Sequence, residues 1–426
     1  MLKGIKIRLY LNDEQQSLIN RLLGSYRFIY NSCLSYKIDA YKNEQKSISL
    51  SDFGHYFHQG LRNEFDWLQE HNTKVLKQSI INLEQAYKNF FKLKKGFPKF
   101  KSRNAVQKVR FPSEAIASKT FDEYISRMNL TTKIKGLKFE CSDRDKKYLY
   151  ANKVGIKSVT IVKNKAGQYY ATILIDGDLL RTVNKPINKS IGIDFGIKTL
   201  LTLSNGETIE NPRWIKSNEK QLKKLHKQLS KKQKGSNNRY KAKLKLAKKH
   251  EKIKNQKLDY LHNITTKIVS ENQVIILEDL NVSGMMKNHK LAKAIQELGL
   301  FEMRRQIEYK SKWYERDLVF VSRWFPSSKT CSCCGWINHN LKLSDREFIC
   351  ENCGLVIDRD ENAAINIDNE GMRIYNEQIG QRLPELTLVD YPTMDEPIRK
   401  KTLKSSGRMK QENVNETQCV TLCKFC

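Results

Sequence analysis

Two closely spaced pairs of cysteines constrain the fold of this chain more than any other feature of its sequence. Cys331 and Cys334 form one Cys-x2-Cys pair, and Cys350 and Cys353 form a second pair after fifteen intervening residues. A glycine directly follows each pair, which suits the tight turn from which two thiolates reach one ion. Four thiolates bind Zn2+ tetrahedrally at about 2.3 Å and leave no position open for water. We therefore expect a structural zinc ribbon over residues 326–354.

The remaining cysteines near these pairs and at the C-terminal end are not expected to bind the same ion. Cys333 is separated from Cys331 by one residue, which is too short for the turn between two ligands. Cys419, Cys423 and Cys426 could bind a second metal, but glycine turns and enclosing apolar residues are missing around them. Buried or redox-active cysteines are the alternative interpretation of the cluster, and its density in one short segment favours metal ligands.

The charge of the chain points to a polyanionic partner. Lys and Arg number 77 against 46 Asp and Glu, which gives a formal net charge of +31. Such a charge destabilises the compact state by self-repulsion unless a polyanion neutralises it. The sequence has no long apolar run and no signal-peptide pattern at its start, so we expect no membrane partner. A cytoplasmic, nucleoid-associated protein that binds nucleic acid is predicted.

The basic residues are concentrated in residues 216–257, which hold seventeen Lys or Arg and two Glu. A solvated helical face is the alternative explanation of such a run, but helices stabilised by their own ion pairs carry both signs in similar numbers. We therefore expect this segment to contact phosphates. The residues expected at the nucleic acid are Lys223, Lys224, Lys227, Lys231, Lys232, Arg239, Lys241 and Lys245.

Three acidic residues stand where a shared metal site could form. Asp194 and Glu278 each follow a short apolar run typical of a buried strand, and Asp360 opens an Ala-containing helix, where the helix dipole favours an acid. Each alone could be a turn cap, a strand-end ion pair or a helix cap. Together they predict a catalytic site for phosphodiester hydrolysis with two metal ions. Carboxylates select Mg2+, or Mn2+ as a substitute, over zinc.

The first half of the chain changes pattern twice. Residues 5–10 alternate apolar and polar as in a half-buried strand, and helical spacing follows, most clearly from residue 73. Short strands and turns then run from 104 to 186. We expect a helical block over 11–103 and a small β-barrel formed by 1–10 together with 104–186.

Four motifs give the chain a family resemblance. They are IGIDFGIKTLLTLSNG at 191–206, VIILEDLNVSGM at 274–285, RWFPSSKTCSCCG at 323–335 and FICENCGLVIDRDENAAINI at 348–367. The last one, in which a cysteine pair leads into Asp-Arg-Asp-x-Asn-Ala-Ala, is the most specific. From about residue 3 to 368 the chain resembles TnpB, the RNA-guided nuclease of bacterial insertion sequences, which is similar to compact type V CRISPR effectors.

The resemblance implies an α+β multidomain fold. It would contain an RNase H-like (RuvC) nuclease domain over 187–325 and 355–370, interrupted by the zinc ribbon. The barrel would be the wedge domain, and the helical block would recognise nucleic acid. Residues 371–426 have no counterpart in the resemblance, and their lack of a sustained periodicity predicts a disordered tail. Leu11 departs from the family pattern, in which proline is expected before Asn12.

The resemblance also implies the reaction and the partners. Family members bind a guide RNA and cut matched double-stranded DNA beside a short flanking motif, and one protein with one RNA is expected. The catalytic acids carry over to Asp194, Glu278 and Asp360. Asp360 is chosen over Asp358 because it is the acid that a single residue separates from Asn-Ala-Ala. The alternatives are a strand-joining transposase and an RNA-guided DNA-binding repressor that does not cut.

Overall fold

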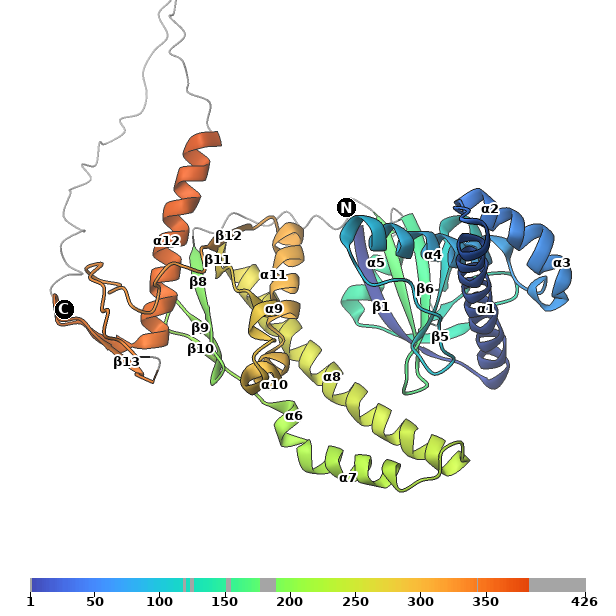
Figure 1. Cartoon of the computed structure of the whole chain (residues 1–426). Helices are drawn as coiled ribbons and strands as arrows, with labels where there is room; N and C mark the ends of the chain where they lie inside the picture. The colour runs from blue at the N-terminus through green and yellow to red at the C-terminus, as the bar shows by residue number, and fades with distance from the viewer. Residues whose placement is uncertain are drawn as a thin grey trace, which may run out of the picture. The chain divides into compact units, whose positions relative to one another are not determined.

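The computed structural model describes residues 2–382 except 118–119, 123–125, 151–154, 177–188 and 343. The chain forms two compact units (Figure 1). The N-terminal unit joins residues 1–182 to residues 216–258, and the C-terminal unit joins 183–215 to 259–426. The segment expected to be a nuclease domain, 187–325, is therefore divided between them. The expected cysteine-containing tail, 383–426, lies outside the described residues.

The N-terminal unit is built on a seven-stranded antiparallel sheet with the order β2-β6-β7-β1-β5-β4-β3. Ile5, Ile7 and Leu9 of β1 are buried between exposed neighbours, which confirms the alternating strand. The strands are β1 (Leu2–Tyr10), β2 (Gln107–Pro112), β3 (Phe121–Asp122), β4 (Arg127–Met128), β5 (Leu137–Glu140), β6 (Gly155–Lys163) and β7 (Tyr169–Asp176). A short helix, α5 (Asp143–Tyr150), follows β5.

The sheet has two edges, β2 and β3, and no hydrogen-bonded ladder joins them among the described residues. The closed barrel expected from the sequence is therefore not seen there. The physical reason at one edge is packing, because helices α1 (Asp13–Glu44) and α4 (Thr73–Leu93) contact β2.

The helical block confirms the sequence signals that marked its helices. Asn12 and Gln15 form the capping box that starts α1, and α4 begins at Thr73. Ser79 donates to the Tyr26 carbonyl at 2.6 Å and joins α4 to α1. Between the two long helices lie α2 (Leu50–His55), a π-helical turn (Tyr56–Leu61), α3 (Arg62–Glu64) and a 3-10 turn (Asp66–Leu68).

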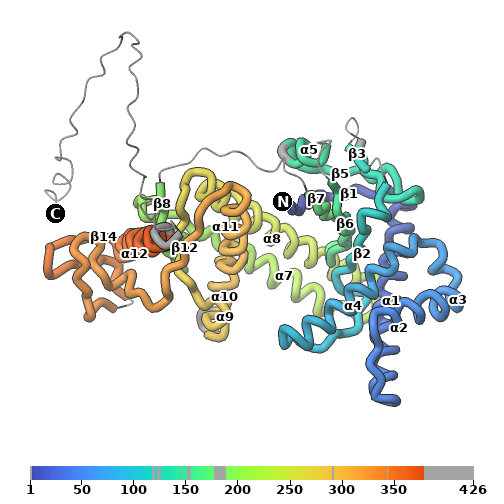
Figure 2. Tube along the Cα trace, turned by 90° about the horizontal axis from the view of Figure 1, so that it is seen from above, coloured from blue at the N-terminus to red at the C-terminus, as the bar shows by residue number. Residues whose placement is uncertain are grey.

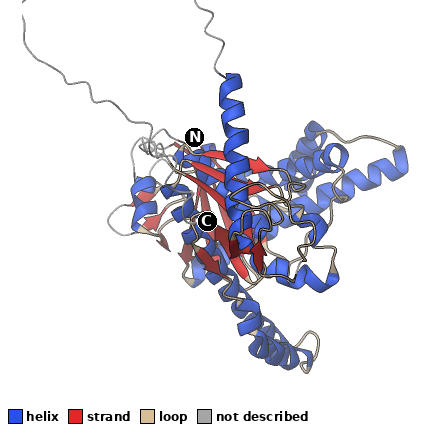
Figure 3. Cartoon of the chain, turned by 90° about the vertical axis from the view of Figure 1, so that its left-hand side faces the viewer, coloured by secondary structure: helices blue, strands red, loops and turns tan. Residues whose placement is uncertain are grey.

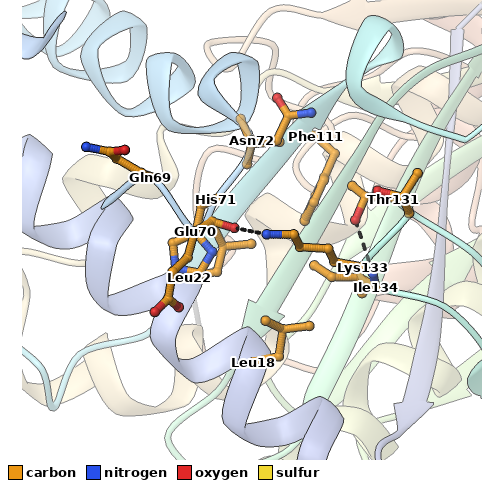
Figure 4. A pocket seen from close by; sticks show the side chains of 12 residues that line it. Leu18, Leu22, Gln69, Glu70, His71, Asn72, Phe111, Thr131, Lys133 and Ile134 are labelled. Carbon is orange, nitrogen blue, oxygen red and sulfur yellow. Dashed lines mark hydrogen bonds between the residues drawn. The ribbon is translucent and has the colours of Figure 1, made fainter. Parts of the chain in front are cut away.

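A pocket of about 250 Å3 remains where the helical block meets the sheet (Figure 4). Lys133 donates to the Glu70 carbonyl at 3.0 Å and links the loop before β5 to the segment before α4. Burial lowers the pKa of His71, which lines this pocket, so its imidazole is uncharged near neutral pH. The pocket is a feature of the packing between helices and sheet.

The basic segment forms two helices, α7 (Glu219–Ser230) and α8 (Asn237–Glu271), which run side by side (Figures 1 and 2). Leu222, Leu225 and Leu246 are buried. A Cβ at Gly167, in the turn between β6 and β7, would lie 3.6 Å from Leu244 of α8. The first half of α8 therefore packs on the sheet of the N-terminal unit.

The C-terminal unit contains a five-stranded sheet with the order β10-β9-β8-β11-β12. Strands β8, β11 and β12 are parallel to one another, whereas β9 and β10 are antiparallel additions. The strands are β8 (Ser190–Phe195), β9 (Thr199–Leu203), β10 (Thr208–Glu210), β11 (Val274–Glu278) and β12 (Asp317–Val321). Helices and strands both make up large parts of the chain (Figure 3), so the α+β expectation is confirmed.

Helices cover both faces of this sheet. Leu261 of α8 and Met303 of α11 (Leu300–Tyr314) pack with Ile275 and Leu277 on one face. Ile367 of α12 (Arg359–Arg382) packs with Ile276 on the other. Shorter helices complete the unit: α6 (Trp214–Ser217), α9 (Val282–Met285) and α10 (His289–Leu298).

Helix α12 lies very close to the sheet because two glycines remove side chains from the contact. A Cβ at Gly192 of β8 would lie 2.4 Å from the Ala364 carbonyl oxygen, and one at Gly371 would lie 2.2 Å from Ile276 Cγ2. The helix continues to Arg382, so the prediction of disorder from residue 371 is wrong for its first part. Met372, Ile374 and Tyr375 pack against the sheet and supply the apolar contact that makes this end helical.

Candidate metal centres and nucleic-acid interface

Asp194 and Glu278 lie at the same edge of the C-terminal sheet. Strands β8 and β11 are paired in parallel, and Ile193 lies opposite Leu277. Asp194 and Glu278 are the next residue on each strand, so the register brings the two predicted acids to neighbouring strand ends. This arrangement follows from two apolar runs that each end in an acid.

Asp360 completes the group from the first turn of α12. Burial, together with the negative charges of Asp360 and Glu278, raises the pKa of Asp194 to about 7. The structure therefore brings the other two predicted acids within electrostatic range of Asp194. Burial also raises the pKa of Glu278, and the positive charge of Arg323 partly offsets this.

Asp358 and Asp360 have different surroundings in the structure. One carboxylate oxygen of Asp358 accepts hydrogen bonds from the backbone amides of Asp360 (2.8 Å) and Glu361 (3.1 Å). Asp358 therefore acts as the cap of α12. Asp360 instead faces two arginines, with Arg359 at 3.1 Å and Arg346 at 3.8 Å.

Asp279, the residue after Glu278, binds two arginines that the sequence analysis did not identify. Arg304 of α11 donates to one carboxylate oxygen at 2.8 Å, and Arg323 binds the other. Hydrogen bonds from Arg304 and Arg323 lower the pKa of Asp279. The position of Asp279 next to a predicted metal ligand is visible in the sequence. The sequence alone does not show which basic side chains pair with this acid.

The four predicted cysteines form the second candidate centre. Their sulfur atoms all lie within 4.8 Å of one another, and this cluster can hold a metal ion such as zinc. Among the described residues, the three acids do not form another group of this tightness. The zinc prediction is thus supported by geometry that a tetrahedral site requires.

The two halves of the ribbon have equivalent turns. Cys331 donates its amide to the Trp336 carbonyl at 2.7 Å, and Cys350 donates to the Leu355 carbonyl at 2.9 Å. Gly335 and Gly354 adopt φ angles of +76° and +73°, which suit glycine far better than other residues. Strands β13 (Glu347–Ile349) and β14 (Val356–Asp358) pair antiparallel behind the second turn.

Hydrogen bonds also set the acidity of individual thiols. Asn352 donates to the Cys334 sulfur at 3.4 Å and is the main cause that lowers the pKa of this thiol to about 6. Burial raises the pKa of Cys331 to about 12. A bound cation would favour the thiolate in both cases, so metal binding and proton release are linked.

Two asparagines fasten the ribbon to helix α12. Asn362 donates to the Thr330 carbonyl at 2.7 Å and accepts from the Ser332 amide at 3.0 Å. Asn366 donates to the carbonyls of Ser327 and Thr330 at 2.8 and 2.6 Å. Both side chains are at least 95% buried. The metal-binding turn and the helix that carries Asp360 are therefore held in one arrangement.

The predicted nucleic-acid residues occupy the α7–α8 hairpin. Seven lysines among them are exposed, and Lys223 pairs with Glu219 at 3.3 Å. Arg239 has an internal role, because it donates to the carbonyls of Leu229 (3.0 Å) and Lys232 (2.7 Å) and thereby holds the hairpin turn.

A basic cleft of about 760 Å3 lies between the sheet of the N-terminal unit and this hairpin. Lysines that are distant in sequence line this cleft. Those on the sheet were not predicted, because a lysine that alternates with apolar residues along a strand is expected to face solvent and not a binding site. The lysines are Lys6, Lys108, Lys165, Lys243 and Lys254.

Comparison with known proteins identifies the class. Residues 172–289 match the IS605 OrfB family, described as "Probable transposase", and residues 301–367 match "Cas12f1-like, TNB domain". A solved "Cryo-EM structure of the Cas12f1-sgRNA-target DNA complex" shares the fold with a TM-score of 0.55 at 16% identity, covering 87% of this chain and 99% of that chain.

Two relatives match along nearly their whole length. "Putative RNA-guided DNA endonuclease" from Streptomyces pristinaespiralis is 35% identical over 373 residues, which cover 87% of this chain and 89% of the relative. "Putative RNA-guided DNA endonuclease InsQ" from Escherichia coli K12 is 30% identical over 382 residues, covering 86% and 91%. The chain belongs to the TnpB family of RNA-guided DNA endonucleases of insertion sequences, which confirms the predicted resemblance.

One family description differs from the geometry. Residues 1–46 match "Helix-turn-helix domain", but this segment contains strand β1 and the single continuous helix α1. Its strand belongs to the centre of the N-terminal sheet. Across the described residues, no helix has both the length and the apolar character needed to span a membrane.

Proposed function

We propose that this protein cuts guide-matched DNA by metal-dependent hydrolysis in a RuvC-type site formed by Asp194, Glu278 and Asp360. The observation that carries the proposal is the placement of Asp194 and Glu278 at adjacent parallel strand ends, with Asp360 near enough to raise the pKa of Asp194. The strand order β10-β9-β8-β11-β12, with helices on both faces, supports an RNase H-like domain.

The donor set fits Mg2+, or Mn2+ in its place. Three carboxylates in one partly buried location repel one another, as the raised pKa of Asp194 indicates, and hard divalent cations neutralise such a group. When bound, two ions would lower the pKa of the attacking water and stabilise the leaving oxygen. Asp194 would hold both ions, and Glu278 and Asp360 would each hold one.

The protein groups around the acids have separate roles. The paired strands fix Asp194 and Glu278, and Asp358 fixes the first turn of α12. Arg346 and Arg359 form ion pairs with the Asp360 carboxylate. Zinc in the four-cysteine cluster would be structural, because four thiolates leave no open coordination position.

The partners follow from charge and family. A guide RNA would supply sequence specificity by pairing with one strand of a double-stranded DNA target, while the protein reads the shape of the duplex and the flanking motif. The exposed lysines of α7 and α8, with those of the adjacent basic cleft, would bind phosphates. One protein with one RNA is the proposed assembly, and it would act in the cytoplasm at the nucleoid.

The test is guided cleavage by purified protein. RNA that co-purifies with the protein is sequenced, and matched DNA is then supplied with Mg2+. Asp194→Ala should abolish cutting while RNA and target binding persist. Asp358→Ala, which removes a nearby acid that caps the helix, should still cut. Normal cutting by Asp194→Ala would disprove the site, and joined rather than free DNA ends would favour the transposase alternative.

A further inference from the structure

Arg323 and Trp324 lie at the same sheet edge as the three acids. Strand β12 is parallel to β11, and Val321 lies opposite Glu278. The Asp279 amide donates to the Val321 carbonyl at 2.9 Å and extends this pairing. Arg323 and Trp324 are therefore the second and third residues after Val321, and they lie just before the zinc ribbon in sequence.

The backbone of this turn holds Trp324 outward. The Phe325 amide donates to the Ser322 carbonyl at 3.0 Å, and Phe325 packs against the face of the sheet covered by α12. The Trp324 amide donates to Ser322 Oγ at 3.3 Å. The Trp324 side chain is left 86% exposed, and its ring contacts no other aromatic ring or cation among the described residues. Tryptophan is usually largely buried, so such an exposed ring indicates a surface that a partner covers.

Arg323 and Arg304 share Asp279 but differ in what else they contact. Arg304 also donates to Glu308 at 3.0 Å and covers the Phe320 ring at 4.4 Å. Arg323 binds Asp279 through a single nitrogen and its charge also acts on Glu278, but among the described residues it makes no other ion pair. A guanidinium has five N–H donors, so most of those on Arg323 remain available. Arg304 therefore has a structural role, whereas Arg323 keeps donors with which an anion could be bound.

We propose that Arg323 and Trp324 form a binding site for single-stranded DNA at the entrance to the nuclease site. The Arg323 guanidinium binds a backbone phosphate, and the Trp324 ring stacks on an adjacent base. Guanidinium pairs strongly with phosphate oxygens, and aromatic rings bind unpaired bases irrespective of sequence. Duplex DNA is excluded because its base faces are occupied by their neighbours. This assignment rests on the proposed function, since it concerns the strand that the three acids would cut.

The first experiment measures stacking without cleavage. The Asp194→Ala protein is loaded with guide RNA and bound to target DNA that carries 2-aminopurine at successive positions of either strand. We expect fluorescence to be quenched at one or two positions near the cut. Trp324→Ala should relieve the quenching and Trp324→Phe should retain most of it. The control is Phe301→Ala, which removes an aromatic side chain that is 69% exposed on α11, and it should leave the quenching unchanged.

The second experiment measures single-turnover cleavage in the otherwise wild-type protein. Loss of one stacked base or one phosphate contact should slow cutting roughly tenfold in Trp324→Ala and in Arg323→Ala. Arg323→Lys should recover part of the rate. Arg305→Ala, which removes an arginine paired with Glu302 on α11, should cut normally. Zinc content and guide-RNA affinity should not change in any of these variants.

Three results would overturn the assignment. Cutting by both alanine variants within twofold of the wild-type rate would show that the pair does not bind the substrate. Quenching of 2-aminopurine in the guide RNA, with none in the DNA, would assign the surface to RNA. A loss of zinc in Trp324→Ala would show a structural role. If the wild-type protein failed to cut while Trp324-dependent quenching persisted, the proposed function would fail and the binding site would stand.

Discussion

The C-terminal unit contains two candidate metal centres that are assembled in opposite ways. The four cysteines come from 23 consecutive residues, Cys331 to Cys353, and two equivalent backbone turns bring their sulfur atoms within 4.8 Å. The three acids come from two strands and a helix that lie far apart in sequence. Without a bound cation they repel one another, and the charges of Glu278 and Asp360 raise the pKa of Asp194. A local site is preformed by its turns, whereas the acidic site is held together by the rest of the fold.

The comparison predicts opposite effects on stability and activity. Glu278→Gln should reduce cleavage by about three orders of magnitude or more, because a metal ligand is lost. The same change should raise the free energy of unfolding in Mg2+-free buffer by about 1 kcal/mol, because it removes like-charge repulsion. Thermal unfolding and single-turnover assays measure both quantities. A lower free energy of unfolding in Glu278→Gln would mean that electrostatic repulsion among the acids does not destabilise the protein.

A cysteine change should act in the opposite direction. Cys350→Ser should release about one zinc per chain and lower stability, because metal binding supplies much of the folding energy of a small ribbon. Cleavage should fall with it through displacement of α12. Cys333→Ser is the matched control and should retain all zinc. Elemental analysis of the purified variants decides this, and equal zinc loss in both would refute the assigned set of ligands.

The hydrogen bonds that join the zinc ribbon to helix α12 can be weakened without changing a ligand of either centre. Asn362→Ala removes a buried side chain and leaves the Ser332 amide unpaired, while the Thr330 carbonyl keeps its hydrogen bond from Asn366; we expect a cost of about 1–3 kcal/mol. We expect zinc to remain bound while cleavage falls about tenfold, since Asp360 is less well positioned. Asn369→Ala, on the exposed side of α12, should change neither. Retention of full activity by Asn362→Ala would show that the centres are independent.

The smallest effect per residue is expected in the basic hairpin of the N-terminal unit. Changing Lys224, Lys227, Lys231 and Lys232 to Gln should weaken nucleic-acid binding and flatten its log–log salt dependence by about 0.7–0.9 per lost phosphate contact. Arg239→Gln should instead lower the stability of the hairpin, because Arg239 binds carbonyls within it. An unchanged salt slope in the lysine variant would identify this face as merely solvated.

Patterns that depend on neighbouring residues were predictable from sequence, and those that depend on packing were not. The cysteine pairs, the capping box at Asn12 and the apolar strands that end in Asp194 and Glu278 are all local. The two arginines on Asp279 depend on which distant side chains share a space, and the internal role of Arg239 depends on how the hairpin turn folds back the carbonyls of Leu229 and Lys232. The end of α12 was misjudged because its apolar residues contact a sheet formed by segments far away in sequence.

The exposure of Trp324 is another feature that packing determines and that the sequence alone does not predict. Its position in a motif was evident, but its outward orientation results from Phe325 taking the inward position beside it. Asp358 and Asp360 are two residues apart and differ in role for a similar reason. Asp358 accepts backbone amides at the helix start, whereas Asp360 pairs with two arginines and its charge acts on Asp194.

The close approach of α12 to the sheet has a genetic consequence. Gly192 meets the backbone of α12, which cannot move without displacing the helix, so alleles with any side chain there should be null and have no simple suppressor. Gly371 instead meets the side chain of Ile276, which a second mutation can shorten. A Gly371→Ala allele should therefore be rescued by Ile276→Ala, which removes every side-chain atom that the new Cβ would meet. Selection for restored function should recover second-site changes at Ile276 when Gly371 is mutated. When Gly192 is mutated, it should recover only reversion to glycine.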